Sequence, residues 1–532
     1  MLHFGVCLRV DPLTATITRP PVLHVARPSL AHQARAIVMN PATKDVAADN
    51  SIPRGVLLHL RQQVAETIDA PVRIEATQSG SQRLVAARSI ASKSVLFRER
   101  PFGTIQSHTG EGADSHVLAC SECMRCAGSI GQQLAHCAGV NQVPSLPTVN
   151  DAAEAPGDLV HCARGCGATY CSRECAEAAE ASHHCVLCPC ASDAAATFDA
   201  AARKHVPDYA RLAAGMLLSA ACVDASASSS AAAVSPSRLA ALLDLCDASF
   251  EDTLSQCDLV DLGLGQEASA VSAMQEHLAS LSGALQAALD SDTEGVSVPA
   301  VVRSAAAAAL TVLREDEGAF SRLLGRLRLN TTSTRVPSPC LAYFEALGTS
   351  EAEEFVESAL EALAPVLQAL QSAPHVVRAR EELLAATTIA RSGSSGDDGV
   401  GSCGATGGGG EKDGNERERE EKEEEVEEDD EDDDQIDAAQ MFPAARGIGW
   451  FVLQSAMNHA CGEAANTQVT TADTTTRAEV IVVATRDIAE GEELAFDYQC
   501  GLRALGAHRE RRLALQQQYR FWCRCNVCID ES

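Results

Sequence analysis

Cysteine and histidine pairs are concentrated in one stretch of this sequence, where eleven of the 22 cysteines fall between Cys120 and Cys190. Zinc takes four Cys or His ligands in a tetrahedron, often as close pairs, because two donors on one short loop reach the same ion. The chain offers, in order, Cys120 with Cys123, Cys162 with Cys166, Cys171 with Cys175, and His184 with Cys188. Mixed His and Cys at ligand spacing in a large chain predicts zinc rather than disulfides.

Further possible ligands lie between these pairs, so the sequence leaves individual ligands open. His183 also has a suitable spacing from Cys175. The competing residues are Cys126, Cys137, His161, His183, Cys185 and Cys190. Spare cysteines of this kind are often buried free thiols. A closed four-ligand site has no open position for substrate, so we expect structural zinc, and a zinc-dependent hydrolase is disfavoured.

Near the C-terminus a second group of residues has spacing that suggests chemistry. Cys523, Cys525 and Cys528 supply three zinc ligands, so a fourth must come from another segment. Upstream lie Asn458-His459-Ala460-Cys461 and then Gly491-Glu492-Glu493-Leu494, which is followed after three residues by Tyr498.

An Asn-His-x-Cys, a Gly-Glu-Glu-Leu-x-x-x-Tyr and a Cys-x-Cys-x-x-Cys in this order resemble the catalytic half of a SET domain. The Cys and His pairs at 120–188 resemble a MYND zinc finger. Together they resemble the SET-and-MYND type of protein-lysine methyltransferase, in a layout closest to plant Trithorax-related SET proteins. The resemblance implies transfer of a methyl group from S-adenosylmethionine to a lysine of a protein, such as a histone tail.

The same resemblance implies roles for individual residues. Tyr498 would be catalytic, orienting the methyl group and the amine at the end of the lysine channel. Cofactor contacts would come from Asn458 and His459, with Ser455 and Asn330 as weaker candidates, and Tyr519 and Phe521 would form aromatic walls.

Resemblance to the family also implies about three zinc ions per chain. The first would be held by Cys120, Cys123, Cys171 and Cys175. The second would be held by Cys162, Cys166, His184 and Cys188. Cys461 would join Cys523, Cys525 and Cys528 in a post-SET site, which would couple metal binding to formation of the active site.

Two segments depart from the family pattern, and both touch cofactor binding. Ser81-Gln82-Arg83 stands where a Gly-x-Gly is usual, and the segment Gly462–Asn466 lacks the usual Pro and is longer. These departures keep a second hypothesis open. It is a catalytically weak SET/MYND binding protein that acts as a transcriptional or protein-interaction scaffold, with a proline-rich peptide as partner of the finger.

The expected fold class is α+β, with a β-rich SET core split by the zinc finger and by an α-helical insert, and with a post-SET zinc tail. Strands are expected at residues 83–87 and 94–98 as an N-terminal hairpin, and helices at Leu239–Cys246, Ser269–Leu289 and Glu351–Ser372. The expected divisions are 1–60 (disordered or targeting segment), 72–110 (SET N-terminal part), 118–190 (finger), 195–391 (helical insert), 392–436 (disordered Gly-rich and acidic loop), 437–500 (SET catalytic part) and 501–532 (post-SET tail).

The net charge of −31 argues against direct DNA binding and favours a basic peptide substrate. Residues 411–434 contain seventeen acidic and four basic side chains, but the remainder of the chain is acidic as well. The apolar stretch Leu212–Val223 is interrupted by Gly and Ser, so we expect a core helix and no association with a membrane. The nucleus and the cytoplasm are both compatible locations, and the Arg-containing N-terminus leaves organelle targeting open.

Overall fold

The computed structural model describes residues 56–76, 82–107, 117–146, 158–228, 237–245, 248–254, 269–291, 298–348, 353–378, 381, 441–471, 477–498 and 508–530. The loop expected at 392–436 lies outside these residues, as do residues 1–55 of the expected N-terminal segment. Residues 56–60 correct the boundary of that segment, because they belong to helix α1 (Val56–Thr67), in which Leu57 and Leu60 are buried.

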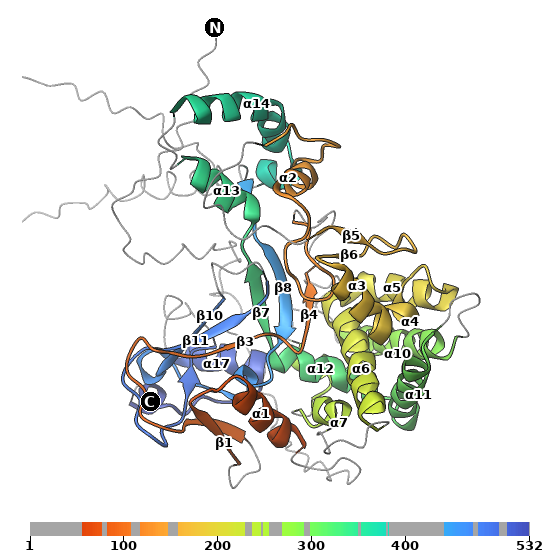
Figure 1. Ribbon diagram of the computed structural model, residues 1–532. Coiled ribbons are helices and arrows are strands. Elements are labelled where there is room, and N and C mark those ends of the chain that lie inside the picture. The colour runs from red at the N-terminus through yellow and green to blue at the C-terminus, as the bar shows by residue number, and fades with distance from the viewer. Residues whose placement is uncertain are drawn as a thin grey trace, which may run out of the picture.

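Short strands from distant parts of the chain form the β-rich part of the fold (Figure 1). They are β1 (Val72–Ala76), β2 (Gln82–Ala86), β3 (Val95–Glu99), β4 (Gly103–Gln106), β7 (Thr331–Val336), β8 (Ala445–Trp450), β9 (Asn458–His459), β10 (Thr467–Thr471), β11 (Val480–Ala484) and β12 (Ala495–Phe496). The sheets have the orders β1-β2, β10-β11-β3, β4-β8-β7 and β12-β9. Strands before and after the intervening 340 residues or so therefore pair directly, as in a split domain.

Both strands expected near the N-terminus form, but they do not make a hairpin with each other. Strand β2 pairs with β1, whereas β3 pairs antiparallel with β11. The Val-Ile-Val-Val-Ala sequence of β11 alternates between buried and half-buried side chains, so it offers β3 an apolar partner. Local β-propensity could not reveal this partner, which lies about 380 residues away.

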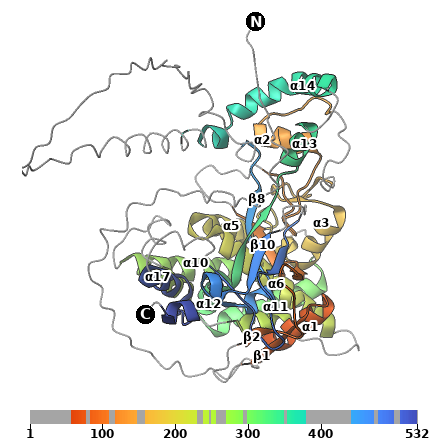
Figure 2. The same ribbon diagram turned by 90° about the vertical axis from the view of Figure 1, so that its left-hand side faces the viewer.

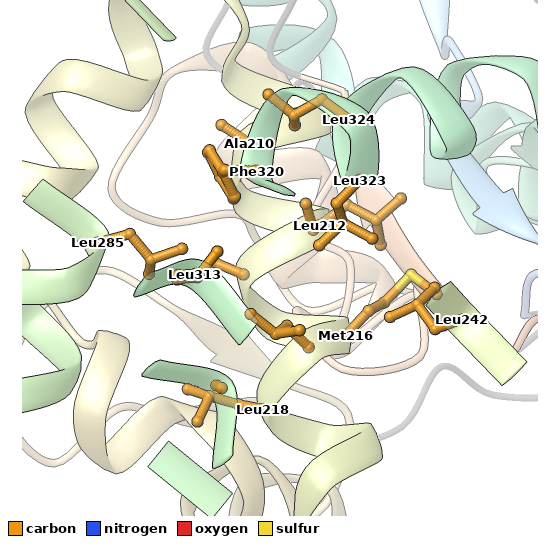
Figure 3. Close-up of a cluster of buried hydrophobic side chains, with 14 of the residues drawn as sticks. Ala210, Leu212, Met216, Leu218, Leu242, Leu285, Leu313, Phe320, Leu323 and Leu324 are labelled. Carbon is orange, nitrogen blue, oxygen red and sulfur yellow. The ribbon is translucent and has the colours of Figure 1, made fainter. Parts of the chain in front are cut away.

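The helical region contains a large apolar core, shown in Figure 3. Its main helices are α5 (Asp193–His205), α6 (Pro207–Ser228), α7 (Arg238–Leu243), α10 (Ser269–Asp290), α11 (Ala300–Glu315) and α12 (Ala319–Asn330). Serine side chains cap the N-termini of α5 and α7, at Ser192 and Ser237. Trp450 of β8 and Leu57 of α1 belong to the same core, which joins the helices to the sheet.

Helix α6 lies at the centre of this core. Within the described residues, only its segment Asp208–Ala227 is long and apolar enough to cross a membrane by length and composition, with a mean hydropathy of 1.3. Leu212, Met216 and Leu218 of α6 point into the apolar cluster of Figure 3 and are nearly inaccessible. The expectation of a core helix over Leu212–Val223 is confirmed.

The expected helical insert is not one unit, because its last two helices pack elsewhere. Helices α13 (Pro339–Gly348) and α14 (Glu353–Gln371) bury their apolar faces against α2 (Ile130–Ala138), which follows Cys126. These three helices lie together at the top of Figure 1 and again in Figure 2, away from the helices of the main core. Helical periodicity predicted α14, expected at Glu351–Ser372, but it predicted neither α13 nor the packing of α14 on α2.

Candidate active site and metal centres

The first cluster of cysteines contains Cys120, Cys123, Cys171 and Cys175, whose sulfur atoms all lie within 4.8 Å of one another. Three of these separations are 3.6, 3.6 and 3.9 Å. Tetrahedral zinc with Zn–S bonds of about 2.3 Å places its ligands about 3.8 Å apart. Ser172 caps α3 (Arg173–Ala179) by accepting from the Cys175 N–H, which turns Cys175 back towards Cys171. The donor set fits zinc.

A second cluster contains Cys162, Cys166, His184 and Cys188, again within 4.8 Å of one another. Nε2 of His184 lies 3.2 Å from the Cys162 sulfur and 3.5 Å from the Cys166 sulfur. Strand β5 (Val160–His161) ends next to Cys162, and its antiparallel partner β6 (Thr169–Tyr170) ends next to Cys171. One small hairpin thus places ligands into both clusters, which interleave along the chain.

The tail forms the third cluster, in which Cys461 joins Cys523, Cys525 and Cys528. The Cys461 sulfur lies 3.8 Å from that of Cys523 and 3.6 Å from that of Cys528. A hydrogen bond from Cys461 lowers the pKa of the Cys523 thiol, whereas the same contact and burial raise the pKa of the Cys461 thiol. Only a cation allows all four thiols to ionise together.

None of the competing residues belongs to a cluster in the described part of the chain. Cys126 contacts the Pro337 carbonyl, and the Cys137 sulfur lies 3.6 Å from Nε2 of His375. Nδ1 of His183 bonds to the hydroxyls of Ser182 and Ser219. Cys185 is buried among helices, Cys190 is exposed, and His161 is exposed in β5. The geometry therefore separates the ligand candidates that spacing left open.

The parallel pairing of β9 with β12 brings Asn458 and His459 beside Ala495 and Phe496. The His459 side chain is 1% exposed. Its Nδ1 accepts from the backbone N–H of Tyr498 at 3.1 Å, and its Nε2 lies 3.2 Å from the Cys461 sulfur. Since Nδ1 accepts, the proton of a neutral ring sits on Nε2 and points to the sulfur. This histidine connects the tail cluster to Tyr498.

Aromatic rings surround Tyr498, whose hydroxyl donates to the Met457 carbonyl at 2.6 Å. The centroid of its ring lies 4.8 Å from Phe496, 4.9 Å from Tyr519, 5.2 Å from His459 and 6.3 Å from Phe521. Tyr519 ends α17 (His508–Tyr519) and Phe521 follows it, so the tail contributes both of these rings to the aromatic cluster. The structure thus brings Tyr519 and Phe521 to Tyr498, as expected.

Asn458 and Asn330, which were also expected to contact the cofactor, lie in different surroundings. Asn458 is exposed and donates to the Glu493 carboxylate at 2.6 Å. Asn330 ends α12, where its side-chain amide donates to the Arg326 carbonyl next to the pairing of Thr331 with Trp450.

Ser455 lies inside the turn that precedes β9. Its hydroxyl accepts from Arg61 and from Trp450, each at 3.2 Å, and donates to the Val452 carbonyl at 3.1 Å. A hydroxyl has one donor and two acceptor positions, so its capacity is used. The hydroxyl is thus engaged within the turn, and its expected cofactor contact stays a prediction.

The irregular segment after Cys461 is ordered. Its residues Gly462–Ala464 form a 3-10 turn that begins at Gly462 with φ +46°, a conformation that favours glycine. Asp497 accepts from the Gly462 N–H at 3.1 Å. Asn466 is 2% exposed, accepts from the Ala495 N–H and donates to the Glu493 carbonyl. These hydrogen bonds therefore hold the Asn466 side chain beside the proposed site.

Two buried charged residues near the site, Arg61 and Glu99, were not expected from the sequence. Both contact the turn Val452–Ser455. Burial raises the pKa of Glu99 to about 7, although hydrogen bonds from the backbone of that turn and the Arg61 charge oppose the shift. No local motif marks them, because their partners lie more than 350 residues away.

Residues 334–499 match the family model of the SET domain. A comparison with curated protein sequences finds no match. The matched region begins within β7, contains β8–β12 and ends just after Tyr498. Strands β3 and β4, which pair with β11 and β8, precede it. The chain therefore contains a SET domain, the fold of a family of S-adenosylmethionine-dependent protein-lysine methyltransferases, together with three Cys/His clusters suited to zinc.

Proposed function

We propose that this protein is an S-adenosylmethionine-dependent protein-lysine N-methyltransferase, with Tyr498 as the catalytic residue. The observation that carries the proposal is the aromatic cluster around Tyr498, built from the end of the SET-matched region and from the tail. When bound, the cofactor supplies a methyl group attached to a sulfonium sulfur. This sulfur is the leaving group, and it needs no general acid.

The chain has to deliver a neutral lysine in line with that methyl group. A lysine amine has an ordinary pKa of about 10.4, so an apolar channel that excludes water must favour its loss of a proton. The rings of Tyr498, Tyr519 and Phe521 are suited to form that channel. Held beside this channel by Asn458 and His459, the cofactor would supply the methyl group: the lysine nitrogen lone pair would form the new N–C bond while the C–S bond breaks and its electron pair remains on sulfur.

Tyr498 is suited to orient the amine rather than to remove its proton. Its hydroxyl donates a hydrogen bond to the Met457 carbonyl, which fixes the orientation of the phenol, and a phenol oxygen can accept from an N–H or a polarised methyl C–H. Alignment of donor, methyl carbon and amine is the larger part of catalysis for such a displacement. Asn458 and His459, on the adjoining strand, are the proposed cofactor contacts.

Charge supports a basic protein segment as substrate, with a histone tail or another lysine-rich protein in the nucleus or cytoplasm as the proposed class. The net charge of −31 would attract such a segment and disfavours DNA. The interleaved order of the first two clusters supports a MYND-type finger, with a proline-rich peptide as its proposed partner. Arg83 occupies a position where the family usually has glycine, and it forms an ion pair with Glu75. Since this departure touches cofactor binding, a binding scaffold is the alternative function.

The test uses the full-length, zinc-loaded protein. Cofactor binding is measured by calorimetry, and methyl transfer to mixed histones and to a lysine-rich peptide library is measured with labelled cofactor. Tyr498→Phe serves as the control. Cofactor binding with transfer supports the enzyme, binding without transfer supports the scaffold, and a folded protein that binds no cofactor contradicts the proposal.

A further inference from the structure

Two buried charged side chains hold the turn that leads into the proposed cofactor strand. Glu99, at the end of β3, is 3% exposed. One of its carboxylate oxygens accepts from the Leu453 N–H and the other from the Gln454 N–H, both at 2.8 Å. These two consecutive amides thus point at one carboxylate.

Arg61 reaches the same turn from α1 and is 5% exposed. Its Nε donates to the Val452 carbonyl at 3.0 Å, and its Nη2 donates to the Ser455 hydroxyl at 3.2 Å. Its Nη1 donates to the Gln82 side chain at 2.7 Å, at the segment where the family has its glycines. Arg61 therefore ties the turn to β2 as well.

The turn continues directly into the proposed reaction site. Gln454–Ala456 forms a 3-10 turn, followed by Met457, whose carbonyl accepts from the Tyr498 hydroxyl, and by Asn458. Thr332 of β7 donates to the Gln454 side chain at 2.8 Å, so the turn is also fixed on its other side. Met457 and Asn458 follow Leu453 and Gln454 by only three to five residues. A displacement of Leu453 or Gln454 would therefore shift both of them.

Apolar side chains could hold such a turn without the cost of burying charge. A buried carboxyl and guanidinium are expensive to desolvate, and each is retained only where several hydrogen bonds compensate. Directional bonds to four consecutive residues, 452–455, fix the backbone more sharply than apolar contacts do. This favours a role in geometry over a role in stability alone.

We propose that Arg61 and Glu99 are positioning residues for the cofactor site, acting through the turn Val452–Ser455 on Met457 and Asn458. The inference rests on the proposed function. It also assigns α1, which lies outside the SET-matched residues 334–499, to the catalytic unit.

The test compares Glu99→Gln, Arg61→Lys and Ser455→Ala in the full-length zinc-loaded protein. Glutamine keeps the shape of Glu99 but can accept from only one of the two amides without presenting a donor to the other. Leu285→Ala, in the helical core, is the control for lost stability because Leu285 lies on α10, which packs mainly against the helices α5, α11 and α12. Zinc content and melting temperature are measured for every variant.

We expect Glu99→Gln and Arg61→Lys to raise the Kd for S-adenosylmethionine about tenfold with three zinc ions retained, and Ser455→Ala to raise it by less. The KM for the cofactor should rise more than kcat falls, and Leu285→Ala should lower the melting temperature without changing Kd. If Glu99→Gln does not fold, the milder Arg61→Lys and Ser455→Ala variants decide. Unchanged Kd in folded variants overturns this inference alone, whereas no cofactor binding by the parent protein overturns the proposed function.

Discussion

The backbone N–H of Tyr498 donates to Nδ1 of His459 across 3.1 Å, and the centroids of the two rings lie 5.2 Å apart. The opposite ring nitrogen faces the sulfur of Cys461 at 3.2 Å. One imidazole therefore joins the proposed catalytic tyrosine to the tail cysteine cluster, and its two nitrogens can be tested separately.

Replacing His459 by Asn or by Gln separates these two contacts. The Asn amide reaches the position of Nδ1, so its oxygen can still accept from Tyr498, whereas the Gln amide reaches the position of Nε2. We expect kcat to fall at least about tenfold more in His459→Gln than in His459→Asn, because alignment of Tyr498 depends on the first contact. Steady-state methyl transfer measures this, and equal kcat in the two variants would contradict it.

Removing Cys461 tests whether the third cluster binds metal and supports the site. Cys461→Ser should lower the zinc content from three to two per chain and weaken cofactor binding, because the tail is then no longer tied to β9. Elemental analysis and calorimetry give the two quantities. Cys340→Ser is the matched control, since Cys340 is buried beside α2 but belongs to none of the three Cys/His clusters found among the described residues. An unchanged zinc count in Cys461→Ser would exclude this metal site.

The carboxyl of Glu99 predicts a pH dependence of stability. Burial raises its pKa in the folded protein from 4.5 to about 7, and Arg61 is the charged group that opposes the shift. Between these values the folded protein binds more protons than the unfolded chain. The contribution of Glu99 to the free energy of unfolding should therefore fall by about 3 kcal/mol as pH rises from 4.5 to about 7, and then level off.

Urea unfolding of the parent protein and of Glu99→Gln at a series of pH values measures this difference. Glutamine does not titrate, so the contribution of residue 99 should disappear from the variant, while those of other groups remain. Curves that stay parallel from pH 4.5 to 7 would show that Glu99 does not titrate in that range.

Asn466 anchors the irregular segment after Cys461, where the chain departs from the family pattern. Asn466→Ala would leave the Ala495 N–H and the Glu493 carbonyl, which belong to half-buried residues, without their partner on the buried Asn466 side chain. We expect a loss of about 2 kcal/mol in the free energy of unfolding, from the usual cost of unpaired buried groups. Denaturant unfolding checks this against Gln63→Ala, at an exposed position of α1. A loss no larger than that of the control would mean that Asn466 is not an anchor.

The metal clusters illustrate what this sequence can predict. Close pairs such as Cys171 and Cys175 sit on one turn, so their spacing already limits which atoms can share an ion. The Asn458–Cys461 and Tyr498 motifs are short as well, and β9 and β12 bring them together as the resemblance implied. The spacing of residues within these short motifs therefore predicts much of the site.

Contacts between distant segments could not be predicted in the same way. The pairing of β3 with β11, the packing of α14 on α2 and the reach of Arg61 to Val452 all join segments far apart in the chain. Apolar periodicity shows which face of an element is buried but not what covers it. A single Arg or Glu carries no pattern, and three of the groups that Arg61 and Glu99 bind in the turn are backbone groups, which are the same in every sequence.

Methyl transfer by the full-length, zinc-loaded protein and by Tyr498→Phe, with labelled S-adenosylmethionine and mixed histones or lysine-rich peptides, tests the central claim most directly. The parent protein should transfer label to lysine. Tyr498→Phe should bind the cofactor with the same Kd but transfer label about 100-fold more slowly, the usual cost of removing one oriented polar group from a reaction site. No transfer by the parent protein, or equal rates for the two, would contradict the assignment of this site to lysine methylation.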